Sequence, residues 1–476
     1  METAEIGLIG LGVMGSNLAL NIAEKGHRIA VFNRTTAKTA AFADSAGALR
    51  GNLVPCETIE ELAAAIRAPR PVIIMVQAGA AVDEQIALLR PVLAAGDIII
   101  DAGNANFRDT VRRFNDLQDS GLAFIGMGVS GGEEGARHGP SIMVGGPEEA
   151  YGRIEPVLTA ISAKYEGEPC SAWLGTGGAG HFVKTIHNGI EYGDMQMIAE
   201  IYGILRDGLG MEAKEIGQVF DRWNQGRLNS YLIEITATVL AARDTETGAP
   251  IVDVILDRAG QKGTGKWSVI EAQTLGVPAT AIEAAVAARV LSAMKNEREA
   301  AEITYGRNLT GRFVADRQTI LPDLELALFA GKIAAYAQGF AVMDAASREF
   351  GWRLPLPTIA KIWRAGCIIR SQFLGTIAEA FESGGGLDNL LMAPAFIAVI
   401  KETHSSLRRV VAAAAEAGLP VPALSSALAY FDGYRQGRGT SNLIQAQRDF
   451  FGAHGFERID APGAHHGPWA AVEKDT

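Results

Sequence analysis

The sequence predicts an α/β domain built on a mostly parallel sheet, followed by a large all-α domain and a C-terminal tail. Up to about residue 177, short apolar runs alternate with helical patterns, which is typical of strand–helix repetition. Beyond that point, long segments rich in Ala, Leu, Ile and Met dominate. From about residue 434 the chain is rich in Gly, Arg, Gln and His. The predicted domains are therefore 1–177, 178–433 and 434–476.

Composition excludes several classes of protein and of partner. Of 476 residues, 48% are hydrophobic and 20% charged, so the chain can bury a large core and is not disordered. Its 43 Lys and Arg against 54 Asp and Glu give a net charge of −11, which repels nucleic acid and anionic lipid. No stretch approaches the ~20 apolar residues of a membrane span, and the N-terminus lacks a secretory signal. With three widely spaced cysteines and no C-x-x-C pair, we expect a cytoplasmic protein without a cysteine-based metal site.

The elements of the first domain follow from local pattern. Runs of aliphatic and β-branched residues predict strands, and amphipathic spacing between them predicts helices. The predicted strands are Ile6–Ile9, Ile29–Phe32, Val72–Val76, Ile98–Ile100, Leu122–Ile125 and Ile142–Val144. The predicted helices include Gly15–Glu24, Ile59–Ile66 and Val82–Leu89. The Gly-rich stretch Leu174–Gly180 predicts the hinge that closes the domain.

A glycine pattern, Gly10-x-Gly12-x-x-Gly15, follows the first predicted strand and opens the first predicted helix. Gly10 permits a tight turn, Gly12 lets the backbone approach a pyrophosphate, and Gly15 allows close packing of helix on strand. The helix N-terminus adds free N–H donors and a positive dipole end. In this position the pattern predicts a Rossmann-type dinucleotide site rather than a purely structural turn.

The end of the second strand indicates which dinucleotide binds. An NAD site usually places Asp or Glu there to accept the ribose 2′-hydroxyl. This chain has Asn33-Arg34-Thr35 instead, with Lys38 one turn on. Because Arg34 can bind a 2′-phosphate with two hydrogen bonds, we expect NADP. The alternative is a solvated loop arginine.

Two further loops of the first domain suit a ligand. Asn104 follows a predicted strand, where ligands bind in open α/β sheets. The run Ser130-Gly131-Gly132 offers a hydroxyl and accessible backbone N–H groups, although an ordinary glycine-rich loop would read the same.

The segment 181–196, HFVKTIHNGIEYGDMQ, is the most informative in the chain. On a helix, one arc carries Lys184, His187, Asn188, Glu191 and Tyr192. An apolar stripe and a face of small residues occupy the other sides. A solvated surface would repeat Lys, Glu and Arg, so we expect the helix to be buried and this arc to face a ligand.

The pattern of the second predicted domain, residues 178–433, predicts helices at Phe182–Asp207, Ala281–Glu302, Leu324–Arg348 and Ala393–Ala417. Residues near 182 and near 329 echo each other weakly, which suggests a duplicated helical unit or two similar buried helices by chance.

A basic, glycine-rich loop, DRAGQKGTGKW at 257–267, contains Lys262 and Lys266. It superficially matches a nucleotide-binding P-loop, but Trp267 stands where that motif needs a hydroxyl, so we exclude an NTPase. We expect the loop to bind an anion. Arg289, in an otherwise apolar helix, is either a buried anion clamp or a snorkelling side chain.

The tail has apolar anchors but no helical or strand period, which predicts docking on another surface. Arg448 and His454 form a possible cation pair within it. We interpret His465-His466 as frayed tail rather than a metal pair.

Taken in chain order, the segments GLIGLGVMG, NRT, GVSGGEEGAR, HFVKTIHNGIEYGDMQ, QKGTGKW and RDFFGAH resemble the 6-phosphogluconate dehydrogenases over essentially the whole chain. The resemblance implies oxidative decarboxylation of 6-phospho-D-gluconate to D-ribulose 5-phosphate and CO2, with reduction of NADP, in the pentose phosphate pathway. It also implies a Rossmann domain, a duplicated all-helical domain, and a homodimer in which the tail of one subunit completes the site of its partner.

The same resemblance implies the residues of the site. Lys184 is the expected base and Glu191 the expected acid, in a mechanism that needs no metal. The implied cofactor contacts are Gly10, Leu11, Gly12, Val13, Met14, Gly15, Asn33, Arg34, Thr35, Met75, Val76, Gln77 and Asn104. The implied substrate contacts are Asn104, Ser130, Gly131, Gly132, His187, Asn188, Tyr192, Lys262 and Arg289, with Arg448 and His454 from the partner subunit.

Two positions depart from the family pattern. Gln77 replaces a lysine at the cofactor rim, which weakens the case for NADP, and His138 replaces a common tyrosine. The alternatives are a smaller β-hydroxyacid dehydrogenase, such as a 3-hydroxyisobutyrate-type enzyme, and a non-catalytic NADP sensor. The smaller enzymes lack the second helical half, the basic loop and the tail. A sensor would not need Lys184, Glu191 and two cation clusters together.

Overall fold

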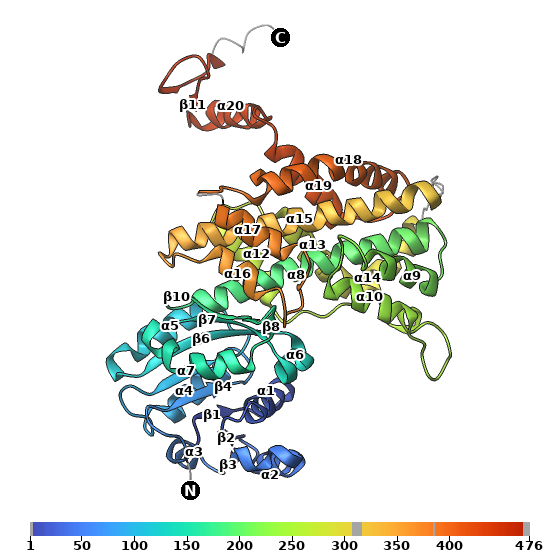
Figure 1. Ribbon diagram of the computed structural model, residues 1–476. Helices are drawn as coiled ribbons and strands as arrows, with labels where there is room; N and C mark the ends of the chain where they lie inside the picture. Colours follow the sequence, from blue (N-terminus) through green and yellow to red (C-terminus); the bar gives the residue numbers. More distant parts are fainter. Residues whose placement is uncertain (1–2, 307–316, 384–385, 470–476) are drawn as a thin grey trace. The chain divides into compact units, whose positions relative to one another are not determined.

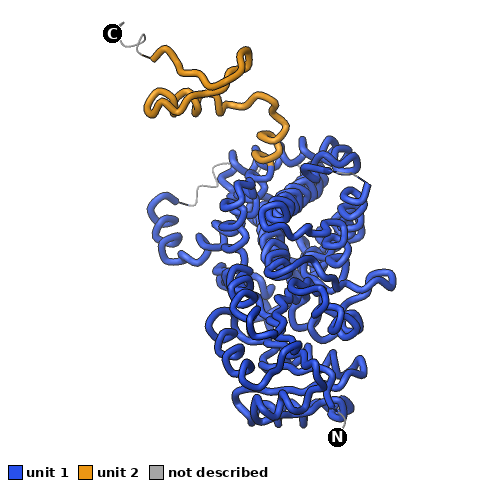
Figure 2. Tube along the Cα trace, turned by 90° about the vertical axis from the view of Figure 1, so that its left-hand side faces the viewer, with its two compact units in different colours: residues 1–427 blue, residues 428–476 orange. Residues whose placement is uncertain are grey.

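The computed structural model describes residues 3–306, 317–383 and 386–469 (Figure 1). The chain divides into two compact units, residues 1–427 and 428–476, and each is described by itself (Figure 2). Unit 1 holds both the sheet and the long helices. The last sheet strand ends at Gly175 and the next helix begins at Ala179, so the predicted boundary at 177 falls in the connecting loop. Residues 470–476 of the predicted tail lie outside the described residues.

The sheet of unit 1 has eight strands in the order β10-β7-β6-β5-β4-β1-β2-β3. Neighbouring strands are parallel except β6 and β7, which are antiparallel. The strands are β1 (Ile6–Ile9), β2 (Ile29–Phe32), β3 (Leu53–Pro55), β4 (Pro71–Ile74), β5 (Ile98–Asp101), β6 (Ala123–Ser130), β7 (Ser141–Gly145) and β10 (Ser171–Gly175). The six predicted strands are all present. The pattern missed β3 and β10, the two edge strands, because β3 has only three residues and β10 begins with a serine and ends with a glycine.

Helices cover both faces of this sheet (Figure 1). A separate hydrophobic core lies on each face. Because successive side chains of a strand point to opposite faces, Leu8 belongs to one of these cores and Ile9 to the other. The helices are α1 (Val13–Glu24), α2 (Thr36–Ser45), α3 (Ile59–Ala65), α4 (Ala80–Leu89), α5 (Phe107–Leu117), α6 (Gly132–His138) and α7 (Glu148–Ile161). The N-terminal part of the chain is therefore the Rossmann-like domain that the sequence predicts.

The rest of unit 1 is helical. Its helices are α8 (Ala179–Gly203), α9 (Ala213–Trp223), α10 (Tyr231–Ala241), α11 (Ile251–Val254), α12 (Thr264–Thr274), α13 (Thr280–Ala293), α14 (Lys295–Tyr305), α15 (Arg317–Glu349), α16 (Leu356–Ile362), α17 (Leu374–Ser383) and α18 (Pro394–Glu416), with α19 (Pro422–Tyr434) crossing into unit 2. The prediction of one helix at Ala281–Glu302 is wrong. The helix breaks at Met294, and α14 starts anew with Lys295 and Arg298 paired to Asp257.

Helix α15 is the centre of the helical part. It packs against α8 and α18, and Gly339 lies directly against Ile190 of α8. These are the two segments whose sequences echo each other; the duplication itself stays a prediction. By length and composition α15 would pass as a membrane span, contrary to the expectation that no stretch approaches one, but 89% of its apolar window is buried inside the protein. It is a core helix.

Unit 2 corrects the prediction that the tail lacks regular structure. It contains the helix α20 (Ser441–Gly452) and a small antiparallel pair, β11 (Phe456–Glu457) with β12 (Ala464–His465). The buried carboxylate of Asp449 accepts hydrogen bonds from the backbone N–H of Gly455 and Gly467 and lies 2.6 Å from Nδ1 of His466. His465-His466 is therefore not frayed: His465 belongs to β12, and His466 contacts the buried carboxylate of Asp449, 17 positions away in the sequence.

Candidate active site

The centre of the candidate site lies where the end of β6 meets the second turn of α8. Nζ of Lys184 is 3.1 Å from Oγ of Ser130 and 3.3 Å from Nδ1 of His187. The other ring nitrogen of His187, Nε2, is 3.2 Å from the same Ser130 oxygen. All three side chains are buried. Two predicted ligand segments, the Ser130 loop and the polar arc of the helix, therefore form one triangle of hydrogen-bonding groups.

Glycines make this close approach possible. A Cβ on Gly128 would lie 2.5 Å from Cβ of Lys184. A Cβ on Gly180 would lie 2.5 to 2.6 Å from backbone atoms of the sheet, the nearest being the Gly145 nitrogen. A side chain at either position would push α8 off the sheet. The arc of α8 is thus pressed onto the carboxyl end of β6.

Burial shifts the proton affinity of Lys184, His187 and Glu191. Desolvation lowers the pKa of Lys184, although the carboxylate of Glu191 opposes this effect. Desolvation also raises the pKa of Glu191, with Lys184 and Arg289 acting in the other direction. The pKa of His187 is well below its ordinary value, because the ring is buried and Lys184 lies beside it. Burial therefore disfavours the charged form of each of these three groups, which is the direction expected where side chains exchange protons.

Glu191 is one helical turn beyond His187 on the same arc. Its Oε2 is 3.7 Å from Nδ1 of His187, and 17% of its side chain is exposed. Asn188 also lies on this face, and its buried Oδ1 has no hydrogen-bond partner among the described residues. A buried acceptor left without a partner costs free energy, so Asn188 fits a donor from a bound polyhydroxy ligand.

A separate cavity of about 660 Å³ is lined by the glycine turn, the loops after β4 and β5, and the basic loop. Its lining residues are Gly12, Val13, Met14, Gly15, Met75, Val76, Gln77, Ala78, Ala102, Gly103, Asn104, Val129, Lys262 and Trp267. A Cβ on Gly15 would lie 1.9 Å from the Gly10 carbonyl oxygen, whereas a Cβ on Gly12 would meet nothing within 4 Å. Gly15 therefore serves packing, and Gly12 leaves the backbone open to the cavity, as a dinucleotide requires.

The second strand supports the glycine turn. Oδ1 of Asn33 accepts the backbone N–H of Leu11 at 3.1 Å, and the backbone N–H of Asn33 donates to Thr39. Arg34 and Thr35 follow at the start of α2, and Arg34 and Lys38 are exposed. The residues present thus fit an adenine dinucleotide, with an accessible arginine at the position that reads the ribose.

Tyr192 connects the arc of α8 to the two helices that carry the predicted anion contacts. A Cβ on Gly265 in α12 would lie 2.5 Å from the Tyr192 ring. The guanidinium carbon of Arg289 in α13 is 3.8 Å from the centre of that ring. Arg289 is half-buried and packs on an aromatic face, so it is neither fully buried nor a snorkelling side chain on an apolar surface.

Some predicted residues lie elsewhere or play no visible part. Arg448 and His454 belong to unit 2 and are exposed there, with Arg448 donating to Gln445. Gly131 and Gly132 form the turn after β6, with φ values of 128° and 64°. His138 is exposed and pairs weakly with Glu134, at 3.8 Å.

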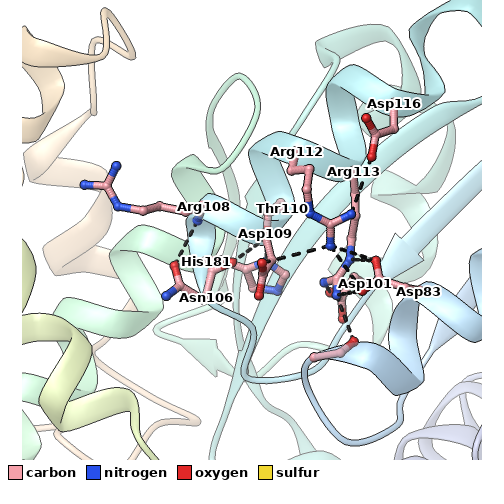
Figure 3. Close-up of polar contacts among 11 residues, drawn as sticks. Asp83, Asp101, Asn106, Arg108, Asp109, Thr110, Arg112, Arg113, Asp116 and His181 are labelled. Atoms are coloured by element: carbon pink, nitrogen blue, oxygen red, sulfur yellow. Dashed lines mark hydrogen bonds and ion pairs between the residues drawn. The ribbon is translucent and has the colours of Figure 1, made fainter.

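Sequence reasoning missed a network beneath the site, drawn in Figure 3. The buried Arg113 donates to Asp83, to Asp101 and to the Gly79 carbonyl, and Asp101 accepts the backbone N–H of Gly103. These bonds hold the loops after β4 and β5, both of which line the cavity. The only sign of this network in the sequence is the mixture of arginine and aspartate in FRDTVRRFND. The same pattern is typical of a solvent-exposed helix face, so it did not identify the network.

Comparisons with known proteins cover both halves of the chain. Residues 5–175 match the model of the NAD binding domain of 6-phosphogluconate dehydrogenase, and residues 180–469 match that of the 6-phosphogluconate dehydrogenase C-terminal domain.

The individual relatives agree on the enzyme but differ in cofactor. The chain is 50% identical over 469 residues to the NADP(+)-dependent, decarboxylating 6-phosphogluconate dehydrogenase of Bacillus subtilis, covering 98% of this chain and 100% of that one. It is 47% identical over 466 residues to the NAD(+)-dependent form from the same organism, covering 98% and 99%. The solved structure of Plasmodium falciparum 6-phosphogluconate dehydrogenase aligns with a TM-score of 0.94 at 42% identity, covering 98% of this chain and 100% of that one.

Proposed function

Because this chain belongs to the 6-phosphogluconate dehydrogenase family, we propose that Lys184 and Glu191 divide the acid–base work of its reaction. The chain is a decarboxylating 6-phosphogluconate dehydrogenase of the pentose phosphate pathway. The proposal is carried by one observation: the buried amine of Lys184, its pKa lowered by desolvation, lies within hydrogen-bonding distance of Ser130 and His187.

Lys184 acts first, as a base. The bound dinucleotide supplies the hydride acceptor. For C3 of 6-phosphogluconate to be oxidised, its hydroxyl must lose a proton, and neutral Lys184 accepts it. Ser130 and His187 hold the amine in place through hydrogen bonds. The oxidised substrate is a β-keto acid.

The protonated Lys184 then assists decarboxylation. When the bond between C1 and C2 breaks, its electron pair moves toward the C3 ketone, and the adjacent ammonium stabilises the charge that develops on the ketone oxygen. CO2 leaves and an enediol remains, with the amine proton returned to that oxygen.

Glu191 completes the reaction as an acid. The enediol needs a proton on the carbon that becomes C1 of ribulose 5-phosphate. Burial keeps the carboxyl group of Glu191 protonated to higher pH than an exposed glutamate, so it has a proton to donate.

For the anionic groups of the substrate we propose Asn104, Ser130, Gly131, Gly132, His187, Asn188, Tyr192, Lys262 and Arg289 as contacts. Arg448 and His454 of unit 2 would reach the site of a partner subunit in a homodimer. Their exposure on α20 and in the turn that follows it supports this assignment, as do the exposed Phe450 and Phe451 beside them, which suit a protein surface.

NADP is the proposed cofactor. The exposed Arg34 and Lys38, together with the absence of a carboxylate from the run 33–35, support a bound 2′-phosphate. We also propose a cytoplasmic location, which suits three buried free cysteines.

The proposed function is tested by supplying 6-phosphogluconate with NADP, and separately with NAD, and following reduced cofactor and CO2 together. Equimolar formation of both products with NADP, at much higher kcat/KM than with NAD, is expected. Reduction of cofactor without CO2, or turnover of 3-hydroxyisobutyrate but not 6-phosphogluconate, would contradict it.

A further inference from the structure

An ion pair crosses from the sheet domain to the helical part of unit 1. Nε and Nη2 of Arg108 donate to the two carboxylate oxygens of Glu271, at 2.8 and 2.6 Å. Arg108 lies in the first turn of α5, and Glu271 lies in α12, 163 positions away in the sequence. The carboxylate is 4% exposed, whereas the arginine side chain is 51% exposed. A two-bond geometry with one buried partner is the arrangement in which an ion pair has most influence.

Each partner is attached to a different wall of the 660 Å³ cavity. Asn104, in the loop that leads into α5, lines one wall. Lys262, in the loop that leads into α12, and Trp267 of α12 itself line another part of the cavity. The distance between α5 and α12 therefore sets how closely these walls approach each other.

Each end of the pair is held by its own packing contact. On α5, Phe107 precedes Arg108 and packs into an aromatic cluster with Phe182 and Trp352, so this end is firmly held. On α12, a Cβ on Gly189 of α8 would lie 2.5 Å from Oγ of Ser268, which shows a tight contact with α8. Separating α5 from α12 would leave the Glu271 carboxylate buried without its charged partner, which is costly. The pair thus favours the arrangement in which both walls face the cavity.

We propose that Arg108 and Glu271 are positioning residues that latch the basic loop of α12 over the dinucleotide site and so set the affinity for the cofactor. This inference rests on the proposed function only in taking the cavity as the NADP site. Neither residue lines the cavity, so the effect is exerted through Asn104, Lys262 and Trp267.

The primary test is Arg108→Met, with the dissociation constant of NADP measured by calorimetry in the absence of substrate. We expect a roughly tenfold weaker complex, within the usual range of coupling between sites, and a kcat at saturation within about threefold of the parent. Arg153→Met is the matched control. Arg153 lies on α7 with 41% of its side chain exposed, and its partners Glu149 and Gly96 belong to the sheet domain and do not line the cavity. It should leave NADP binding unchanged.

A double-mutant cycle distinguishes an effect of the Arg108–Glu271 pair on cofactor binding from a general effect on the stability of the fold. Arg108→Met leaves a buried charge without a partner, whereas Glu271→Gln leaves only an exposed guanidinium. Glu271→Gln and the double variant should therefore weaken NADP by about the same factor, roughly threefold, and less than Arg108→Met does. Arg108→Lys, which keeps the charge but loses the two-bond geometry, should fall between the parent and Arg108→Met.

Hydrogen exchange then locates the effect. In Arg108→Met, amides of residues 259–267 should exchange faster than in the parent, while those of β1 and β4 should not. If the variants melt at lower temperature but bind NADP like the parent, or if the two single effects simply add, the latch is overturned. Because the readouts are binding and exchange, they remain decisive even if the parent proved to oxidise a different substrate.

Discussion

Nζ of Lys184 and Oγ of Ser130 lie 3.1 Å apart, and this contact joins the sheet domain to the first long helix that follows it. Ser130 ends the longest strand of the sheet, and Lys184 stands in the second turn of the longest helix of the site. Because Ser130 also contacts His187, a small movement of β6 against α8 would disturb the base and its neighbour together.

Replacing the two proposed acid–base residues should affect different steps. Lys184→Ala should reduce oxidation by roughly 10²–10⁴-fold, the usual contribution of a positioned base. Glu191→Ala should leave the first hydride transfer largely intact and slow protonation of the enediol. Stopped-flow measurement of cofactor reduction in a single turnover, compared with the rate of ribulose 5-phosphate release, distinguishes the steps. If the Lys184→Ala variant oxidised the substrate at the rate of the parent, Lys184 would not be the base.

The pH dependence of kcat/KM should report this pair. The reaction needs neutral Lys184, so the rate falls as the pH drops and the amine takes up a proton. It also needs protonated Glu191, so the rate falls as the pH rises and that proton is lost. Burial raises the pKa of Glu191, and Glu191→Gln cannot ionise, so the alkaline limb should disappear from the profile of its residual activity. The exposed Glu134 provides the control, and a Glu134→Gln profile should match the parent.

Cofactor choice should depend on Arg34. Arg34→Asp exchanges a cation for a carboxylate that repels a 2′-phosphate, so kcat/KM for NADP should fall far more than that for NAD. Arg50→Asp, a change of the same charge outside the run 33–35, controls for the general effect of charge. Equal losses for both cofactors would show that Arg34 does not read the 2′-phosphate.

The tail should complete the site of a partner subunit. Lys184→Ala and Arg448→Ala chains are each expected to be inactive. In a mixed dimer with exchanged tails, one site receives both lesions and the other receives neither, so activity should reappear. Mixed dimers are prepared by co-expression with two purification tags, and their kcat is compared with that of each parent variant. Mixed dimers no more active than the single variants would exclude a shared site.

The stability of unit 1 should respond to Glu200. This buried carboxylate on α8 accepts the backbone N–H groups of Ala423 and Leu424 at the start of α19. Desolvation raises its pKa from 4.5 to about 7. A raised carboxyl pKa means that the folded state holds a proton which the unfolded state has already released, so stability falls as the pH rises from 4.5 to 7.

Glu200→Gln removes this ionisation. Its free energy of unfolding, measured in urea, should therefore change less between pH 5 and pH 8 than that of the parent, by up to about 3 kcal/mol. Glu416→Gln, at an exposed position of α18, should follow the parent. A parent-like pH dependence in Glu200→Gln would show that another group is responsible.

The sequence predicted those elements whose formation depends on residues close together in the chain. The six strands are dense in Ile and Val, and the turn after β1 needs glycine at Gly10, where φ is 103°. The polar arc of α8 follows from helical spacing alone. For these features, steric preference and the alternation of apolar residues act over a few positions, so no distant contact is required to read them.

The tertiary structure decided the rest, because burial and partnership depend on residues far away in the chain. It is the packing around α8 that buries Lys184 and most of the Glu191 side chain and so shifts their pKa values. Asp449 organises a tail that has no readable period. The folded chain also paired Arg108 with Glu271, which lie in the sheet domain and in the helical part. The sequence by itself determined which chemical groups lie on the catalytic helix. Only the folded chain determined how their pKa values shift, since desolvation is a property of the surroundings.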